Sequence, residues 1–491
     1  MSLVRLGPVS RPCRRRRWHL LQRPWTRVIG EWLLTVSQVA PSEPVRQVAA
    51  RTTLDTASCA IAGLQHPATQ AMAKMVRYLG EGGDCSLVGQ PAGRPVVSAI
   101  LHNGTAIRAL DCNDVFWSDG EVHGHPSDNI AAALAFAEMV DASGLDYIRA
   151  IAAGYELYWR LQHHLLTTSP SWDHVSASGM VTAAVAGILL ELDVDRLTDA
   201  IAIGAAHSYT LGQIRFGSIP MAKASANAVA SVGGALAALM AKEGVTGPPE
   251  ILEGKRGLVP ALGLPVQTEL LEALTAPVEE WHILHSCLKP YPAVGTAQAA
   301  IEATIRLVER HDVDASTIEA ITIHLADSET NRSHIADKDR ADPRSHEAAD
   351  HSLPFLVAVA AEDRDAGVAQ FRDERWLRPG TRALMARIAF DVDPLLRADA
   401  YTAQPAVATC LLATGERLQE EVLAAPGAPN EPLSAAEINR KFLRITGQAA
   451  ALPVEISDAM SSVAESSSMR KTGAVLRREL QPPDSRPPSS S

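Results

Sequence analysis

The 491-residue sequence is poor in cysteine and in aromatic residues. Its six cysteines lie far apart and form no Cys-x-x-Cys pair, so neither a disulfide framework nor a zinc or iron–sulfur cluster is predicted. Apolar runs are short as well: alanine-rich segments such as 181–190 end at charged residues before they reach the length of a membrane span. We therefore expect a soluble protein of a reducing cytoplasm, without a membrane partner.

Acidic residues outnumber basic residues in the whole chain, but arginines are concentrated at its start. The formal net charge is −11, which argues against nucleic acid as a partner. Residues 1–30 reverse this balance, with eight arginines and no acidic residue before Glu31. A mitochondrial transit peptide would be arginine-rich but also serine-rich, whereas a translated upstream extension needs no such composition. Both interpretations stay open, and we expect residues 1–30 to be a disordered extension.

Alanine is abundant and falls within stretches of helical periodicity. Together with a hydrophobic content of 46%, this predicts a mainly α fold with a large all-helical domain at 31–279. Alternating β-branched residues at 317–325 and 386–392 predict strands of a smaller α+β domain at 280–404. The remaining expected segments are helices that return to the large domain at 405–465 and a disordered tail at 466–491.

Titratable side chains concentrate at Asp111–Asp128, in the sequence DCNDVFWSDGEVHGHPSD. A loop of this kind, held by helices, is a common location for catalytic groups. Ser127 is expected to cap the following helix, with Asp128 in its first turn. His125 precedes this helix and stands among carboxylates that would tune its pKa, which makes it the strongest single candidate. The alternative is a solvated acidic loop with surface histidines.

Other polar residues of this loop admit several roles. Asp111 and Asn113 could orient His125 or hold the loop, and we favour a structural role for Asp114. A competing interpretation takes His123 and His125, with nearby carboxylates, as metal ligands. His-x-His spacing alone is weak support for a metal site, so we expect no metal.

Three residues outside the loop are further candidates. His174 begins a helix of small residues in SWDHVSASGM, where a satisfied structural histidine is an equally good interpretation. Lys223 stands in the first turn of an alanine-rich helix, against the dipole preference, and lysines so placed often meet an anion. Lys289 lies between the two expected domains, with Tyr291 two residues on. Either lysine could instead be an ordinary surface side chain.

Five segments of the chain together resemble the MmgE/PrpD family, and most closely its 2-methylcitrate dehydratase branch. They occur in the order FWSDGEVHGHPSDN, SWDHVSASGM, SIPMAKASANAVAS, KPYPAVGTAQAAIEA and EAADHSLPFLVAVA, and the match runs from about Asp55 to Phe442. The resemblance implies a helical domain with a smaller α+β lid, a homodimer, and cofactor-independent chemistry on small di- and tricarboxylates. Members include 2-methylcitrate dehydratase, cis-aconitate decarboxylase and iminodisuccinate epimerase.

Carried over by position, the resemblance implies a catalytic site made of Asp111, His125, His174, Lys223 and Lys289. These are the residues selected above, except that the residues alone left Asp111 open. The expected substrate-binding positions are Asn113, Tyr291 and His351, the last of which could equally be a structural cap.

The chain departs from the family pattern at two places. Thr296 and Gln298 stand where many relatives carry histidine after the KPYP motif, and His346-Glu347 replaces an Arg-Glu pair before ADHSLP. Each change removes or weakens a group that could bind a carboxylate or move a proton, so the substrate is less firmly implied than the fold.

The expected chemistry is proton abstraction next to a carboxylate, which requires cations that are already in place. Lys223 and Lys289 fit this task, and His125 and His174 could divide the base and acid roles. Dehydration of 2-methylcitrate is the leading hypothesis. Decarboxylation, epimerisation and carboxylate binding without catalysis are the alternatives.

Overall fold

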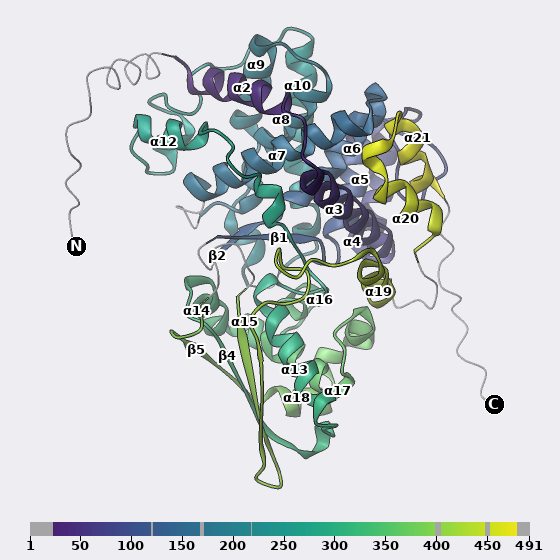
Figure 1. Cartoon of the computed structure of the whole chain (residues 1–491), viewed down its shortest axis with the longest axis vertical. Coiled ribbons are helices and arrows are strands. Elements are labelled where there is room, and N and C mark those ends of the chain that lie inside the picture. The colour runs from purple at the N-terminus through teal and green to yellow at the C-terminus, as the bar shows by residue number, and fades with distance from the viewer. Residues whose placement is uncertain are drawn as a thin grey trace.

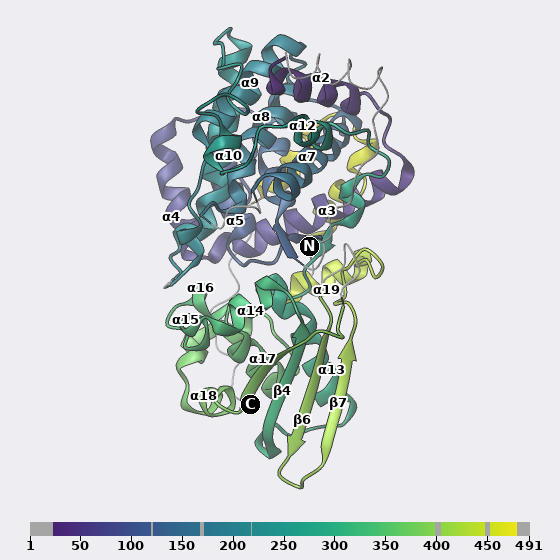
Figure 2. The same cartoon turned by 90° about the vertical axis from the view of Figure 1, so that its left-hand side faces the viewer.

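The computed structural model describes residues 23–118, 121–166, 171–217, 219–397, 404–446 and 452–478. Within them, a large helical domain and a smaller α+β domain lie end to end along the long axis of the molecule (Figures 1 and 2). The expected fold class, mainly α with a smaller α+β domain, is confirmed.

The large domain is a bundle of helices packed around α10. Its helices are α2 (Trp25–Ser37), α3 (Glu43–Ala62), α4 (Pro67–Met75), α5 (Val96–Arg108), α6 (Ile130–Val140), α7 (Gly144–His164), α8 (Ser178–Leu189), α9 (Val194–His207), α10 (Ala222–Lys242), α11 (Leu258–Ala261) and α12 (Thr268–Leu274). Small residues let α10 approach α5, α8 and α9 closely. A Cβ on Gly234 would lie 2.2 Å from the carbonyl oxygen of Gly179 in α8, so only glycine fits there.

By length and composition alone, α10 could cross a membrane. This differs from the expectation that the apolar runs are too short for a membrane span. In the structure 61% of its apolar window is buried against neighbouring helices. Its first turn carries the buried side chain of Lys223. We therefore assign α10 as the core helix of the large domain.

A three-stranded sheet corrects the expectation that the domain at 31–279 is all helical. Its strands are β1 (Asp114–Ser118), β2 (Glu121–Gly124) and β3 (Cys287–Leu288), in the order β2-β1-β3. The loop 111–128 is therefore largely a hairpin, and β1 pairs antiparallel with a segment more than 150 residues later. Four- and two-residue strands are too short to show a strand period in the sequence.

The small domain has a four-stranded sheet in the order β5-β4-β6-β7, covered on one face by helices. Its strands are β4 (Ile318–Ala326), β5 (Ile388–Asp393), β6 (Ala406–Leu412) and β7 (Arg417–Val422). Its helices are α13 (Gln298–Arg310), α14 (Glu329–Ala336), α15 (Lys338–Ala341), α16 (His346–Ala349), α17 (Leu353–Asp363) and α18 (Pro379–Met385). β4 is parallel to β5 and antiparallel to β6, and α13 packs on β6 and β7 beside α17.

Several segment boundaries differ from the sequence-based expectation. Residues 405–424 are not helical: they form β6 and β7, and Ala425 still belongs to the core of the small domain. The run AVATCLL is continuous rather than alternating, and periodicity cannot distinguish such a buried strand from a helix. The extension expected at 1–30 ends earlier, because α2 begins at Trp25, and residues 1–22 lie outside the described residues.

The C-terminal segment returns to the large domain, as expected. Helices α19 (Ala435–Thr446) and α20 (Val454–Ser461) pack on α3. The expected tail at 466–491 is helical in its first part, because α21 (Met469–Ala474) packs on α6. Residues 479–491 lie outside the described part of the chain.

Candidate active site

The site begins where α5 ends and the hairpin starts. Asp111 follows α5 in the left-handed backbone region, with φ of 48°, a conformation that aspartate tolerates better than most side chains. Pairing of β1 with β3 places Asp114 opposite Leu288. Lys289 therefore arrives beside Asp111, although 178 residues separate them in the sequence.

The carboxylate of Asp111 is the centre of a buried group of cations. It accepts hydrogen bonds from Lys223 Nζ at 2.8 Å, from Arg108 NH1 at 3.1 Å and from Lys289 Nζ. Burial alone would raise the pKa of Asp111, but the charges of Arg108, Lys223 and Lys289 outweigh it and hold the pKa well below its ordinary value. Asp111 is thus a permanent anion that keeps both lysines in place.

Two residues of the small domain complete this group. Lys223 Nζ lies 3.5 Å from Asp350 Oδ2 and 3.3 Å from His351 Nδ1, and His351 Nε2 lies 3.4 Å from Asp111 Oδ2. Burial and the charge of Lys223 lower the pKa of His351 to about 4, so its ring is neutral near pH 7. His351 therefore lies beside Lys223 and Asp111, and the group spans both domains.

Asn113 is a buried residue that contacts the group through Arg108. Its carbonyl oxygen accepts from Arg108 NH1 at 2.6 Å, and its amide donates to Ser127 Oγ and Asp128 Oδ1. Ser127 does not cap a helix with its side chain, contrary to expectation, because its hydroxyl donates to Asp114 Oδ1 at 2.6 Å. Because both ends of its amide are engaged by Arg108, Ser127 and Asp128, a structural role fits Asn113 better than direct substrate contact.

His125 is buried behind the hairpin with a defined orientation. Its Nδ1 bonds the carbonyl oxygen of Asp114, which leaves Nε2 as the unprotonated nitrogen of the neutral ring. Burial, and then the charges of Arg108 and Lys289, hold the pKa of His125 well below its ordinary value. At neutral pH the ring can accept a proton.

His174 lies next to His125, with ring centroids 5.1 Å apart. Its Nε2 is 3.3 Å from Arg215, and Arg215 also makes a two-point contact with Asp173. Burial is the main reason why the pKa of His174 falls to about 3, although Asp173 acts in the opposite direction. Both histidines are therefore neutral in the substrate-free protein.

Tyr291 is not brought to the Asp111 group. Its hydroxyl donates to Glu302 at 2.6 Å, Arg444 lies over its ring, and it belongs to the core of the small domain. Gln298 holds the turn that contains Tyr291 by bonding the backbone of residues 291–294. Since Lys289 Nζ also donates to the Ala293 carbonyl at 3.3 Å, Gln298 supports the lysine indirectly.

The other departures from the family pattern have neighbours that the sequence did not reveal. Thr296 Oγ1 lies 2.8 Å from Nδ1 of His334, so α14 brings a histidine beside Thr296. Burial, followed by Arg340 and His351, holds the pKa of His334 well below its ordinary value. The ring of His346 packs near His66 rather than against the Asp111 group.

Asp111, Asp350 and His351 are spaced closely enough to hold a metal ion, but the positive charge of Lys223 lies among them. Ligand atoms of Asp111, Asp350 and His351 lie within 4.8 Å of one another. The ammonium group of Lys223 contacts all three, in the position that a cation would take. His123 does not join His125 in a ligand set, because its ring lies against His163 instead of His174.

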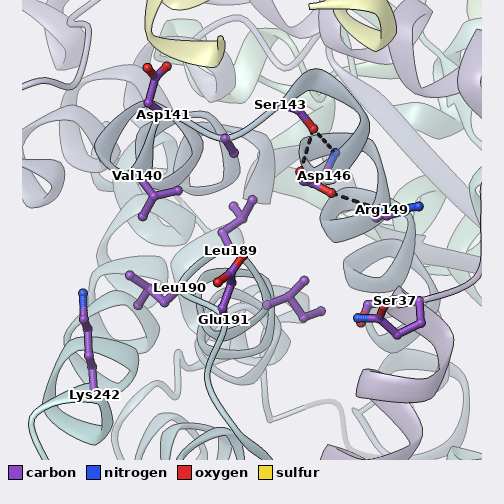
Figure 3. A pocket seen from close by; sticks show the side chains of 13 residues that line it. Ser37, Val140, Asp141, Ser143, Asp146, Arg149, Leu189, Leu190, Glu191 and Lys242 are labelled. Atoms are coloured by element: carbon purple, nitrogen blue, oxygen red, sulfur yellow. Dashed lines mark hydrogen bonds and ion pairs between the residues drawn. The ribbon is translucent and has the colours of Figure 1, made fainter. Parts of the chain in front are cut away.

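A cavity of about 580 Å³ lies elsewhere in the large domain, at the ends of α2, α6, α8 and α10. Its polar side chains are partly engaged with one another, as Ser143, Asp146 and Arg149 show in Figure 3. None of the residues that line it belongs to the Asp111 group. The candidate catalytic side chains therefore lie at the buried junction of the two domains and not at this cavity.

Sequence reasoning missed Arg108, Arg215, Asp350, His334 and Arg340. Asp350 lies inside the segment EAADHSLPFLVAVA and Arg108 lies three residues before Asp111, so their place in the sequence could have suggested them. The other three lie on a turn and two short helices whose approach to the site depends on how the domains meet.

The chain belongs to the MmgE/PrpD family. The MmgE/PrpD N-terminal domain matches residues 27–270 and the MmgE/PrpD C-terminal domain matches residues 291–459. Among curated proteins it is similar to a 2-methylcitrate dehydratase of Cupriavidus necator, at 26% identity over 76% of this chain and 79% of the relative. The corresponding figures are 26%, 76% and 80% for the Escherichia coli 2-methylcitrate dehydratase. A cis-aconitate decarboxylase-like protein of Aspergillus oryzae is 26% identical over 62% of this chain and 67% of its own.

Proposed function

We propose that this protein is a lyase that dehydrates a small hydroxy-tricarboxylate without a metal, with 2-methylcitrate as the substrate and 2-methyl-cis-aconitate and water as products. The observation that carries the proposal is the buried group in which Lys223 and Lys289 converge on Asp111, beside a neutral His125. Family membership and the names of the relatives support the reaction class.

The lysines answer the main energetic difficulty of this reaction. Removing a proton next to a carboxylate places two negative charges on neighbouring atoms, which is unfavourable unless fixed cations receive them. Lys223 and Lys289 are fixed by Asp111 before substrate arrives, so no reorganisation is needed when the charge develops. The cations gathered around Asp111 would also attract an anionic substrate to a protein whose net charge is −11.

His125 is the proposed base. Its Nδ1 proton is committed to the Asp114 carbonyl, so Nε2 carries the lone pair that would take the proton from carbon. The electron pair of the broken carbon–hydrogen bond is first held by the neighbouring carboxylate. It then forms the carbon–carbon double bond as the carbon–oxygen bond breaks, and the hydroxyl takes up one proton and leaves as water.

Lys289 is the proposed donor of that proton. The expectation that the two histidines divide the base and acid roles fits poorly, because both are neutral in the free protein. Burial lowers the pKa of Lys289, although Asp111 partly opposes it, and an ammonium with a lowered pKa is a better acid than an ordinary lysine. His174 would then position substrate beside His125.

The test is turnover of 2-methylcitrate, citrate, cis-aconitate and iminodisuccinate by the purified full chain, with products separated by chromatography. We expect dehydration of 2-methylcitrate to be fastest. Release of carbon dioxide from cis-aconitate would make the protein a decarboxylase instead, the reaction named for one relative. Turnover of none of the four, with citrate still binding by calorimetry, would refute the enzyme and leave a carboxylate-binding protein.

Exhaustive chelation tests the absence of a metal. Since Lys223 stands where a cation would bind between Asp111, Asp350 and His351, we expect unchanged turnover after dialysis against a chelator. Loss of activity that added zinc or magnesium restores would refute this part of the proposal.

We also propose that two copies associate through α10. This helix, otherwise buried, exposes Val229, Leu236 and Met240, which are 58%, 45% and 39% exposed and recur at helical spacing. Leu236→Arg should give a monomer in light scattering, while Leu395→Arg, at a site 87% exposed in the small domain, should leave the assembly unchanged. A wild-type monomer would refute the dimer.

A further inference from the structure

Arg340 on α15 is a buried cation with unused donors. The residue is only 6% exposed, and its Nε lies 3.2 Å from Asp337 Oδ2. Among the residues that the structure describes, its buried NH1 has no hydrogen-bond partner. An unsatisfied guanidinium nitrogen is costly inside a protein, because the water it has lost is not replaced. Such a group needs either a structural reason or an absent ligand.

The surroundings of Arg340 place it where the two domains meet. Figure 2 shows α15 and α16 at the end of the small domain that faces the helical domain. Asp339, the residue before Arg340, lies close to the turn that follows Arg215. A Cβ built on Gly217 in that turn would lie 3.8 Å from Asp339 Oδ2. Arg215 itself contacts His174, so α15 lies against the segment that holds one of the candidate histidines.

The electrostatic neighbours of Arg340 come from both sides of this junction. Burial is the largest influence on the pKa of Arg340 and lowers it, Asp337 and Asp350 raise it, and Arg215 lowers it again. Asp350 lies 3.5 Å from Lys223 Nζ, the lysine bound to Asp111. The charge of Asp350, which belongs to the Asp111 group, and the charge of Arg215, which contacts His174, therefore both act on Arg340.

A second group on the adjoining helix faces the same region. His334 on α14 bonds Thr296, and the charges of Arg340 and His351 act on its ring. The start of α14 is tied to the hairpin of the large domain, because Glu121 accepts from the backbone nitrogens of Glu329 and Thr330 at 2.9 and 3.1 Å. The helices that bring His334 and Arg340 to the junction are thus anchored across it.

We propose that Arg340 binds one carboxylate of the substrate through its free guanidinium donors, on the small-domain side of the site, with His334 beside it. The inference rests on the proposed function, since it requires an anionic substrate at the Asp111 group. A planar guanidinium matches a carboxylate with two parallel hydrogen bonds, and a buried one gains most from such a partner. The two lysines receive the charge of the reacting end of the substrate. Arg340 would select for an additional carboxylate.

The test compares Arg340→Gln with Arg344→Gln in the full-length protein. Arg344 is the matched control because it lies on the same segment and has a side chain 69% exposed, and because, within the described part of the chain, its one ion pair is with Asp342. We expect Arg340→Gln to weaken citrate binding in calorimetry by roughly 10- to 100-fold, the loss typical of a charge-assisted hydrogen bond, and to change malate binding less than about threefold. For 2-methylcitrate, KM should rise by a similar factor with kcat little changed, and Arg340→Lys should restore part of the loss.

Thermal unfolding separates ligand binding from a structural role. If Arg340 serves only its ion pair with Asp337, Arg340→Gln should lower the Tm of the ligand-free protein and keep the stabilisation by citrate. Our inference predicts an unchanged or higher ligand-free Tm, because an unsatisfied buried charge is removed, and a smaller citrate-induced shift. Equal citrate affinity in Arg340→Gln and wild type would overturn the inference. Calorimetry needs no turnover, so this outcome is distinct from failure of the dehydratase proposal.

Discussion

Replacing Asp111 with asparagine should destabilise the protein strongly, because it removes the charge on which three buried cations depend. The carboxylate contacts Arg108, Lys223 and Lys289, and its own side chain is 3% exposed. Asparagine has nearly the same shape but carries no charge, so the change isolates electrostatics from packing. Breaking one buried ion pair by removing a partner typically costs about 3–5 kcal/mol. We expect a loss of at least that size.

A nearby carboxyl provides the matched control. Asp128 is also fully buried and pairs with Arg108, but burial raises its pKa to about 6 despite that arginine. A carboxyl whose pKa rises on folding destabilises the folded state when ionised, by about 1.4 kcal/mol per unit, or roughly 3 kcal/mol here at pH 7. Asp128→Asn should therefore leave stability almost unchanged or increase it, whereas Asp111→Asn should lower it.

The assay is thermal unfolding followed by circular dichroism at pH 7, where a loss of about 3–5 kcal/mol in a chain of this length corresponds to a Tm lower by roughly 3–5 °C. The pKa of Asp111 is depressed, so its stabilisation is present above the unfolded-state pKa of about 4 and is lost as the pH falls below it. The difference between wild type and Asp111→Asn should shrink below about pH 4. Equal Tm values for Asp111→Asn and wild type at pH 7 would refute the view that this carboxylate organises the site.

Three further outcomes are expected. His125→Gln should reduce kcat by roughly 10²- to 10⁴-fold with little change in Tm, because glutamine cannot accept the proton and the neutral ring carries no charge to lose; steady-state kinetics with the unfolding curve of the same sample checks this. Since the pKa values of His125 and His174 are both lowered, to about 3 for His174, kcat/KM should not fall as the pH decreases from 8 to 5.5, and a decline with midpoint near 6.5 would contradict the neutral rings. Glu121→Ala should speed amide hydrogen exchange at Glu329–Ala336 and leave exchange in α17 unchanged, because Glu121 bonds the first amides of that helix from the opposite domain.

The class of fold was accessible from the sequence because it depends on local information. Alanine-rich helical periodicity predicted the large domain, and alternation predicted the strand at Ile318–Ala326. The residues that mark the start of a helix also indicate His125 and Lys223 as candidates, because each lies next to such a start. At 406–422 the sequence predicts helix and the structure has two strands, because a continuous apolar run has no period that distinguishes the two.

What the residues do together was decided by tertiary structure. The pairing of β1 with β3 brings Lys289 to Asp111, and the small domain supplies His351 to the same carboxylate. No local pattern encodes that Tyr291 faces its own domain's core or that Arg340 is buried with an unused donor. The sequence alone predicted the helices of the large domain and the candidate histidines and lysines, because propensity and periodicity act over a few residues. The charges, neutral rings and free donors depend on burial by segments more than 100 residues away, and only the folded arrangement determines them.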